Sequence, residues 1–361
     1  MTQSTSAAMV TEPDAPEGRG AVLIRALLTQ RVLLIAILLV LVITTMFALD
    51  AAGLMLGNYN VAYMASSLIN LVPLAMLGLA QLVVIVTGRG AIDLSVGSMV
   101  SLVSVVFGFA HGMWGVALVP AVILAVLAGG VLGLVNGVLV AYLGFPPLIA
   151  TLATYYAYWS LAIVISGQQP ISSPEIQALY GASRSVPIPG LQGILPPIPL
   201  GIFLFLLPTV LLVWYLMNRS PDGRRLYATG TNHVAATWSG ISVAGIRLRA
   251  FVISGLISGL VAVVTVSQFA SARPDAGNSA SGMALPAITI AILGGVAITG
   301  GIGRVAGVVL AALLVVWLNA GILLLFPGNQ GAQYQLLALG VILVFAALLN
   351  GYTNRRYQLL T

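Results

Sequence analysis

The chain has 361 residues, of which 60% are hydrophobic and only 6% are charged, and its mean hydropathy is +1.08. A water-soluble domain carries roughly a quarter charged residues, so this composition predicts an all-α, polytopic membrane protein. The net charge of +6 comes from arginines dispersed along the chain, which disfavours a nucleic-acid partner, and the sequence has no cysteine for disulfides or thiolate chemistry.

The first 30 residues precede the first long apolar run. Three acidic residues (Glu12, Asp14 and Glu17) and two prolines lie in this segment, and no cleavage pattern closes the first span. A secretory signal begins with basic residues and ends at a cleavage site, so this segment does not match one. Residues 1–30 therefore predict a short cytoplasmic tail, followed by a helix that stays in the membrane.

The apolar runs leave room for about ten membrane-spanning helices of about 20 residues each. We predict spans at residues 31–49, 62–87, 94–111, 115–142, 147–166, 200–217, 250–268, 284–299, 305–326 and 334–350. With the amino terminus inside, only Arg184 and Arg273 fall outside, which leaves twelve of the 14 arginines in cytoplasmic segments. This bias predicts a transmembrane domain over 31–350 and a cytoplasmic tail at 351–361.

The stretch from Gly88 to Ser98 lies between two apolar runs and carries Asp93, the only carboxylate well inside the hydrophobic block. A charge near hydrocarbon is costly, so such a residue faces protein or water and has a structural or functional role. Arg89 stands four residues earlier, within reach of Asp93 if the segment is helical. We predict that Asp93 ties this turn by hydrogen bonds to nearby backbone or to Arg89; a gating role is the alternative. The signature residues of this structural segment are Arg89, Asp93, Ser95 and Gly97.

Two connections between the predicted spans are long. The outside loop at about 167–199 is rich in proline and polar residues, and it is either a passive connector or a docking surface for an extracytoplasmic protein. The cytoplasmic loop at about 218–249 contains the turn Pro221-Asp222-Gly223 and a short helix that Asn232 caps and Gly240 ends. That helix either docks onto a soluble partner or rests on lipid headgroups.

Two of the predicted spans end in similar short sequences, a weak sign of an internal repeat. Val84-Ile-Val-Thr-Gly88 and Val296-Ala-Ile-Thr-Gly300 each precede a glycine-bearing turn and a new helix. Both follow a span predicted to run from outside to inside, so a duplication would keep the same orientation.

Catalysis is not expected. The sequence has no lysine, so a P-loop lacks its phosphate-contacting residue, and coupling to ATP requires another chain. His111 and His233 fall on opposite sides of the membrane, so they form no shared metal site. A secondary transporter driven by an ion gradient is the rival reading, but Asp93 is nearly its only candidate relay.

Several ordered motifs resemble the ribose-type permeases of bacterial ATP-binding-cassette (ABC) importers. They are Gly90-Ala-Ile-Asp-Leu-Ser-Val-Gly-Ser98, Asn136-Gly-Val-Leu-Val-Ala141, Ala150-Thr-Leu-Ala-Thr154, Ser166-Gly-Gln-Gln-Pro170, Gly223-Arg-Arg-Leu-Tyr-Ala-Thr-Gly230, Ser239-Gly-Ile241, Ser254-Gly-Leu256, Ala287-Ile288, Gly294-Gly295 and Gly300-Gly-Ile-Gly303. The resemblance covers about residues 65–350.

This resemblance implies a permease subunit that carries a monosaccharide or related polyol across the bacterial inner membrane. It implies a pair of permeases, two cytoplasmic ATPases that bind ATP and magnesium, and a periplasmic sugar-binding protein, with no cofactor on this chain. It also implies that residues 232–241 form the helix that inserts into the ATPase. The residues expected in that ATPase-coupling helix are Asn232, His233, Ala235, Ala236, Trp238, Ser239, Gly240 and Ile241.

One departure from the ribose pattern bears on the partner. The segment from Ser271 to Ile288 lacks the Glu-Leu-Asp that often precedes Ala-Ile in ribose permeases. It resembles the subgroup that includes one subunit of the autoinducer-2 importer and of rhamnose importers, which work beside a second, different permease. A heterodimer is therefore an alternative to a homodimer.

A polar route between two permease halves needs uncharged side chains on the spans. The candidates for lining it are Asn70, Gln81, Ser98, Asn136, Thr151, Thr154, Tyr155 and Gln268. Each could instead hold helices together, as small and amide side chains commonly do in membranes. A structural or signalling subunit that moves no solute is the third functional hypothesis, beside the permease and the ion-driven transporter.

Overall fold

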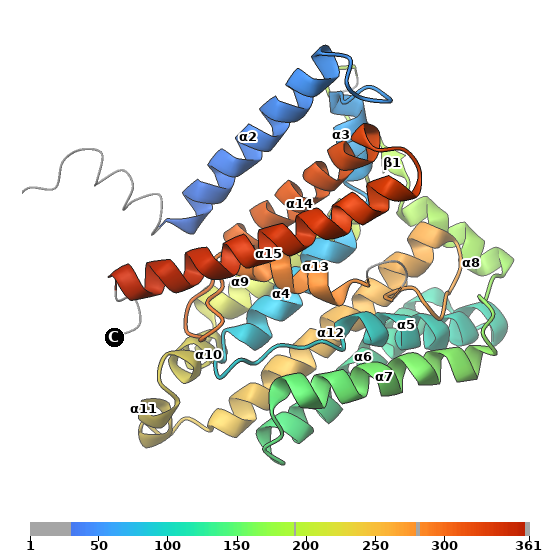
Figure 1. Ribbon diagram of the computed structural model, residues 1–361. Coiled ribbons are helices and arrows are strands. Elements are labelled where there is room, and N and C mark those ends of the chain that lie inside the picture. Colours follow the sequence, from blue (N-terminus) through green and yellow to red (C-terminus); the bar gives the residue numbers. More distant parts are fainter. Residues whose placement is uncertain (1–29, 191–192, 279–281, 358–361) are drawn as a thin grey trace, which may run out of the picture.

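The computed structural model describes residues 30–190, 193–278 and 282–357, and nearly all of them lie in helices (Figure 1). The predicted tail over residues 1–29 and the last four residues lie outside the described part. Within it, eight helices are long and apolar enough to cross a membrane, or nine if one bent pair counts as a single span. The prediction of a polytopic helical membrane protein is confirmed, although ten was only an approximate count.

Every predicted span contains helical structure, and eight of the ten correspond to one long helical segment. The long helices are α2 (Arg31–Ala51), α5 (Val96–Phe107) with the π-helical turn η1 (Gly108–Met113), α6 (Leu118–Ala141), α7 (Pro147–Ser166), η3 (Ile202–Leu206) with α9 (Leu207–Arg219), α12 (Val243–Phe269), α14 (Val305–Leu325) and α15 (Asn329–Tyr357). The helix α12 begins seven residues before the predicted span, where the Ser242 hydroxyl accepts a bond from the Gly245 amide at 3.3 Å. The helix α15 continues beyond the predicted end at 350.

The predicted span 62–87 is not one helix. It is broken into α3 (Val61–Ser67) and α4 (Leu71–Ile85), which meet at an angle of 52°. Pro73 lies in the first turn of α4, where its missing N–H removes the bond that a continuous helix would make to the Ile69 carbonyl. The chain therefore starts a new helix at this point and leaves that carbonyl free for another partner.

The predicted span 284–299 is also shorter than expected. The helix α13 (Ala284–Leu293) has only ten residues, because Gly294 and Gly295 end it and Gly295 adopts a φ of +90°. The apolar residues that follow belong to a turn. Two short helices, α4 and α13, thus occupy the interior of the bundle, and nearly all their side chains are buried.

Burial separates a central group of helices from an outer group. In α12, 78% of the most apolar stretch is inside the protein, whereas α2 and α15 have only 11% inside. The helices α6 and α12 cross so closely that a methyl group on Gly129 or Gly133 would overlap the backbone of α12 near Gly255. Small residues permit such close approach of membrane helices. The contact between α6 and α12 therefore holds the central group of helices together.

The two ends of the bundle carry different elements (Figure 1). One end holds α10 (Pro221–Thr231) and α11 (His233–Trp238), beside the start of α2 and the end of α15. The opposite end holds α3, α8 (Pro174–Ala178), η2 (Leu179–Ala182) and the two-stranded pair β1 (Ser185–Val186) and β2 (Ile198–Pro199). The long loops at about 167–199 and 218–249 therefore lie at opposite ends.

Candidate transport pathway and coupling surface

A cavity of about 460 Å³ lies at the end of the bundle that carries α3. It is bounded by the break between α3 and α4, the last turn of α12, the start of α13, and parts of α14 and α15. Its polar lining consists of Tyr63, Ser66, Ser67, Asn70, Gln268, Asn319 and Gln335. Among the described residues that line it, none is charged.

The α3–α4 break shapes this cavity. The Ile69 carbonyl, freed by Pro73, accepts a hydrogen bond of 2.8 Å from Nε2 of Gln268 at the end of α12. Asn70 is exposed at the start of α4 and makes no capping bond with its side chain. On the other wall, Nε2 of Gln335 donates to the Asn319 carbonyl at 3.0 Å. The cavity therefore presents amide groups with hydrogen-bonding capacity to spare.

Asp93 occupies a second polar region, deep between α4, α5, α6 and α12. Its side chain is fully buried, and Oδ1 accepts bonds from the Ser95 amide at 3.0 Å and the Ser95 hydroxyl at 2.7 Å. Nδ2 of Asn136 lies 3.4 Å from the same oxygen, and the Ser254 hydroxyl donates to Oδ2 at 3.2 Å. We call Asp93, Ser95, Asn136, Ser254 and Gln81 the Asp93 network.

Gln81 completes the network from α4. Its Nε2 donates to the Asp93 carbonyl at 2.6 Å, and its Oε1 accepts from the Asp93 amide at 3.3 Å. The backbone of Asp93 is therefore held in place while its side chain binds three other elements. The Asp93 side chain therefore binds the nearby backbone, which is one of the two contacts considered for it from the sequence.

Arg89 is placed differently from the helical arrangement considered above. Residues 86–95 form turns rather than a helix, Arg89 has a φ of +58°, and it is exposed. The spacing of four residues therefore does not bring Arg89 onto the same helix face as Asp93. Hydroxyl and amide donors provide the described contacts of the Asp93 carboxylate instead.

The other pathway candidates lie away from the cavity lining. Thr151 accepts a bond from the Leu94 amide at 3.1 Å, so it secures the turn before α5. Ser98 and Thr154 donate to backbone carbonyls three residues earlier, at 2.9 Å and 3.2 Å. Tyr155 is half-buried on α7, with its ring 5.9 Å from that of Trp159. Of the eight candidates, Asn70 and Gln268 line this cavity.

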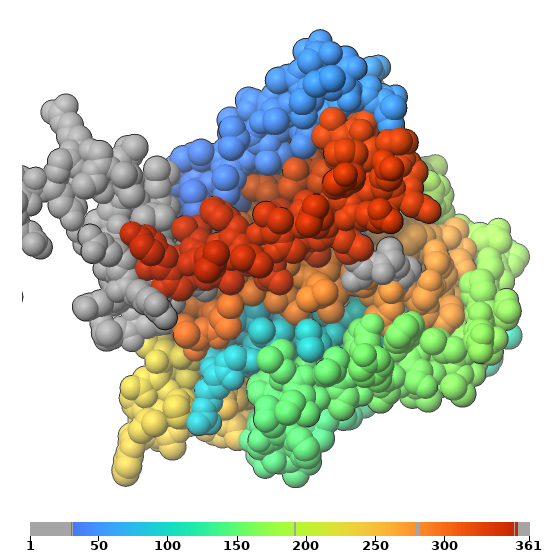
Figure 2. Space-filling view, viewed as in Figure 1, coloured from blue at the N-terminus to red at the C-terminus, as the bar shows by residue number. Residues whose placement is uncertain are grey.

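The helix α11 projects from the other end of the molecule, where the α10–α11 segment forms the lower-left edge in Figure 2. Oδ1 of Asn232 accepts bonds of 3.0 Å from the amides of Val234 and Ala235, as expected for a capping residue. Gly240 has a φ of +78° and follows the last turn. Trp238 is 87% exposed, so α11 presents a large aromatic side chain to its surroundings.

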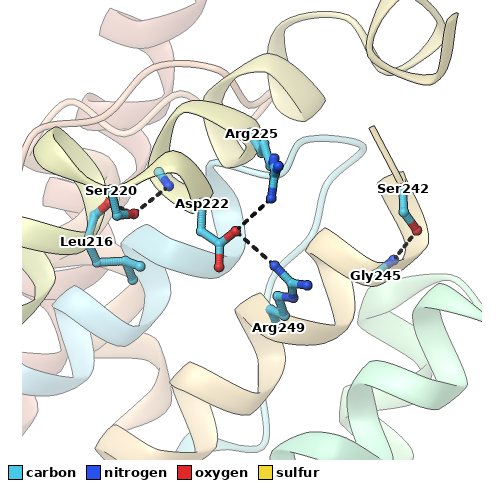
Figure 3. Close-up of polar contacts among 8 residues, drawn as sticks. Leu216, Ser220, Asp222, Arg225, Ser242, Gly245 and Arg249 are labelled. Atoms are coloured by element: carbon cyan, nitrogen blue, oxygen red, sulfur yellow. Dashed lines mark hydrogen bonds and ion pairs between the residues drawn. The ribbon is translucent and has the colours of Figure 1, made fainter. Parts of the chain in front are cut away.

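Asp222 links this segment to α12 (Figure 3). Its carboxylate contacts Nη1 of Arg249 at 2.8 Å and Nη1 of Arg225 at 3.4 Å. The Ser220 hydroxyl accepts the Gly223 amide at 3.0 Å and donates to the Leu216 carbonyl at 2.6 Å, which fixes the turn from α9 into α10 (Figure 3).

Sequence reasoning missed several members of these sites. Ser254 and Arg249 are far along the chain from their carboxylate partners, Asp93 and Asp222, and no local pattern pairs them. The motif Ser254-Gly-Leu256 marked this position in the sequence but did not indicate that Ser254 binds Asp93. Asn319 is an isolated amide in the apolar helix α14, and Gln335 is one of several amide residues at the start of α15, so the sequence does not single out either one as a cavity residue.

Comparison with known proteins identifies the family. The family described as "Branched-chain amino acid transport system / permease component" matches residues 63–347. The autoinducer 2 import system permease protein LsrD of Yersinia enterocolitica is 37% identical over 242 residues, which span 67% of this chain and 70% of the relative. Proteins of the same name from Yersinia pseudotuberculosis and Yersinia pestis are 36% identical over the same shares. No solved structure matches.

The apolar helical bundle and the family match together identify a multi-pass membrane transport permease. The chain belongs to the family of transport-system permease components whose description is given above, because that match covers most of its length and the relatives exceed 30% identity. The predicted membership of the ABC importer permeases is thereby confirmed, and the ion-driven transporter is not favoured.

Proposed function

We propose that this chain forms half of the membrane conduit of an ATP-driven, binding-protein-dependent importer for a neutral, hydroxyl-rich solute of the autoinducer-2, ribose or rhamnose kind. The cavity at the α3–α4 break carries this proposal. It is large enough for a small molecule, lies beside α3 at the end of the bundle opposite α11, and has a polar lining of amides and hydroxyls among apolar residues.

The charge of the lining argues for a neutral solute. A free amino acid carries an ammonium and a carboxylate, and desolvating either group requires a compensating charge. The described lining offers none, whereas Asn70, Gln268 and Gln335 provide donors and acceptors that suit hydroxyl groups. The names of the relatives, which refer to autoinducer 2, agree with this choice within the family.

The energy source lies on another chain in this proposal. The sequence has no lysine with which to build a P-loop, so a partner ATPase binds ATP and magnesium. The exposed Trp238 and Val234 make α11 the surface that docks into that ATPase. This orientation makes the α11 end cytoplasmic, together with both chain termini, and assigns the loop at about 167–199 to docking of a periplasmic binding protein.

A second permease, either another copy or a relative, completes the conduit. The cavity is only partly enclosed by this chain, and in this proposal a facing subunit encloses the solute. Closure of the ATPase pair then switches the two halves between outward-open and inward-open states. Weak, dispersed contacts suit release better than one tight site.

Reconstitution into liposomes tests the proposal. The permease, its partner permease if it has one, the ATPase and the binding protein are incorporated together, and uptake of autoinducer 2, D-ribose and L-rhamnose is measured with and without ATP. We expect ATP-dependent uptake of at least one of these three solutes. Accumulation by the permease alone, driven by a proton or sodium gradient, would overturn the proposal, as would the absence of any ATP-driven uptake.

The coupling surface has its own test. Changing Trp238→Asp places a charge on the exposed face of α11 without touching the bundle interior. We expect the complex to lose ATP-driven uptake while the permease still inserts in the membrane with normal yield. Uptake equal to the wild-type rate would show that α11 is not the ATPase contact.

A further inference from the structure

Three backbone segments that are distant in sequence meet at Gly88, Gly230 and Gly300. Gly88 follows α4, Gly230 lies in the last turn of α10, and Gly300 follows α13. A methyl group on Gly230 would overlap the Val86 carbonyl oxygen and the Gly301 amide, and one on Gly300 would overlap Gly88. We call this contact the glycine junction. It brings together the two similar Val-x-x-Thr-Gly segments noted in the sequence.

Hydrogen bonds hold the junction together. The Gly301 amide donates to the Val86 carbonyl at 3.0 Å, which ties the turn after α13 to the end of α4. The Tyr227 hydroxyl, one turn before Gly230, donates to the Gly303 carbonyl at 2.7 Å. The helix α10 therefore packs against two turns, one that follows α4 and one that follows α13.

The junction lies directly beside the coupling helix. Only Asn232 separates α10 from α11, and its backbone amide bonds to Ala228 at 3.1 Å while its side chain caps α11. This residue binds both helices, so it transmits a displacement of α11 to the last turn of α10. A displacement of α11 by the ATPase is therefore also a displacement of Gly230.

The other ends of α4 and α13 reach the cavity. Asn70, Pro73 and Leu74 at the start of α4 line it, as do Met283 and Pro286 at the start of α13. The helix α4 spans about 22 Å and α13 about 15 Å at 1.5 Å per residue. The helix α4 therefore connects the cavity to the turn at Gly88, and α13 connects it to the turn from Gly294 to Gly300.

A competing path runs through the ion pair between Asp222 and Arg249, which joins α10 to α12. Both side chains are substantially exposed, at 37% for Asp222 and 56% for Arg249. Exposed ion pairs are screened and geometrically loose, whereas backbones packed in van der Waals contact resist compression. The junction is therefore stiffer than this ion pair.

We infer that the glycine junction carries the movement of α11 into α4 and α13, and so into the cavity, with Gly230 as a positioning residue for transport. This inference rests on the proposed function. Gly230 is helical, so alanine there adds only a methyl group between the three backbones. That methyl forces α10 away from both turns and weakens the transmission of its movement.

The test compares two glycine-to-alanine changes in the complete reconstituted complex. Gly230→Ala alters the junction, and Gly340→Ala is the matched control, because a methyl at that helical position in α15 meets nothing within 4 Å. The readouts are copurification of the ATPase, ATP hydrolysis, and uptake per ATP hydrolysed of whichever of the three solutes the wild-type complex imports.

We expect Gly230→Ala to retain the ATPase and hydrolyse ATP, with uptake per ATP lowered about tenfold, within the range of typical coupling between distant sites. Gly340→Ala keeps the wild-type ratio. Equal ratios in the two variants would overturn the inference while leaving the proposed function intact. A wild-type complex without ATP-driven uptake would instead reject the proposed function, and the inference with it.

A second variant covers the case in which Gly230→Ala fails to assemble. Tyr227→Phe adds no volume and removes only the hydroxyl that binds the Gly303 carbonyl. We expect uptake per ATP to fall about threefold, as for the loss of one hydrogen bond. A wild-type ratio in Tyr227→Phe would then overturn the inference.

Discussion

Gln81 and Gln268 are the same side chain in two polar regions of one bundle. Gln81 is fully buried and uses both its amide groups on the backbone of Asp93. Gln268 is half-buried, uses Nε2 to bind the Ile69 carbonyl, and lines a cavity beside the exposed Asn70. The side chains of the Asp93 network thus bind mainly one another and the nearby backbone, with Oδ1 of Asn136 as the one buried acceptor among them that has no partner, whereas the cavity keeps hydrogen-bonding groups available for a solute.

This difference separates scaffold from pathway. A buried polar network is stable when nearly all of its groups are paired, and it then specifies one arrangement of the helices that contribute to it. A solute pathway requires the opposite, because groups already paired with protein cannot exchange water for solute. We therefore expect substitutions in the Asp93 network to reduce folding and those in the cavity lining to reduce uptake.

Asp93→Ala is the most severe way to break the network. The change removes the acceptor of the Ser95 amide, the Ser95 hydroxyl and the Ser254 hydroxyl, whereas Nδ2 of Asn136 keeps its bond of 2.7 Å to the Ser95 hydroxyl. Each unsatisfied buried group costs about 1–3 kcal/mol. The sum is comparable with the stability of a whole domain, so we expect the folded yield to fall about tenfold or more. Fluorescence-detected size-exclusion chromatography in mild detergent measures this yield.

Asp93→Asn is the control for that experiment. The amide retains the shape of the side chain and one acceptor oxygen, so part of the yield returns, and uptake per folded molecule stays near the wild-type value. A normal yield combined with lost transport in Asp93→Asn would assign Asp93 to gating instead of scaffold.

Asn70→Leu tests the cavity. Asn70 is exposed at the start of α4 and makes no capping bond, so leucine removes polarity at similar size without stranding a partner. We expect ATP-driven uptake to fall about tenfold at unchanged folded yield, comparable to losing one good polar contact with a solute. Uptake is measured in the reconstituted complex.

Thr44→Val on α2 is the comparison for Asn70→Leu. It also removes a polar group from an exposed helix position, where the hydroxyl binds only its own helix, but on a helix away from the cavity. Equal uptake in the two variants would remove Asn70 from the pathway.

The sequence predicts the helical segments well and their interruptions poorly. Each of the ten apolar runs contains a helix, but hydropathy does not distinguish α13 from the apolar turn after it, because Val296 and Ile298 are as apolar as the helix itself. The break before α4 depends on a single proline at its first turn. Such breaks matter here because they create the cavity and the glycine junction.

The sequence also predicts the polar sites only in part, because their contacts join residues that are distant along the chain. The cost of a charge in the membrane identifies Asp93 from the sequence, but its partners Asn136 and Ser254 lie 43 and 161 residues away. Hydropathy also gives Gln81 and Gln268 the same value. Whether an amide is satisfied depends on tertiary contacts, so the division of the eight pathway candidates required the structure.

Asp222→Asn compares the buried carboxylate of Asp93 with a carboxylate that lies outside the bundle interior. Asp222 is exposed and pairs with arginines, so its removal costs only about 0–1 kcal/mol of stability. We expect normal yield and a thermal midpoint within a few degrees of wild type, since about 1 kcal/mol corresponds to roughly 2–4 °C in a protein of 150–250 residues. A loss of yield like that of Asp93→Ala would contradict the argument from burial.

Ser254→Ala is the smallest of these changes and the most direct measure of one network bond. Alanine removes a hydroxyl that lies 3.2 Å from Oδ2 of Asp93 and leaves the three contacts at Oδ1 in place. Hydrogen bonds between membrane helices average about 0.6 kcal/mol, so we expect the thermal midpoint to fall by roughly 1–2 °C with unchanged uptake. Because Ser254 also has no role in the cavity, a drop in uptake at an unchanged midpoint would place α12 in the pathway at this depth and end the separation of the two regions.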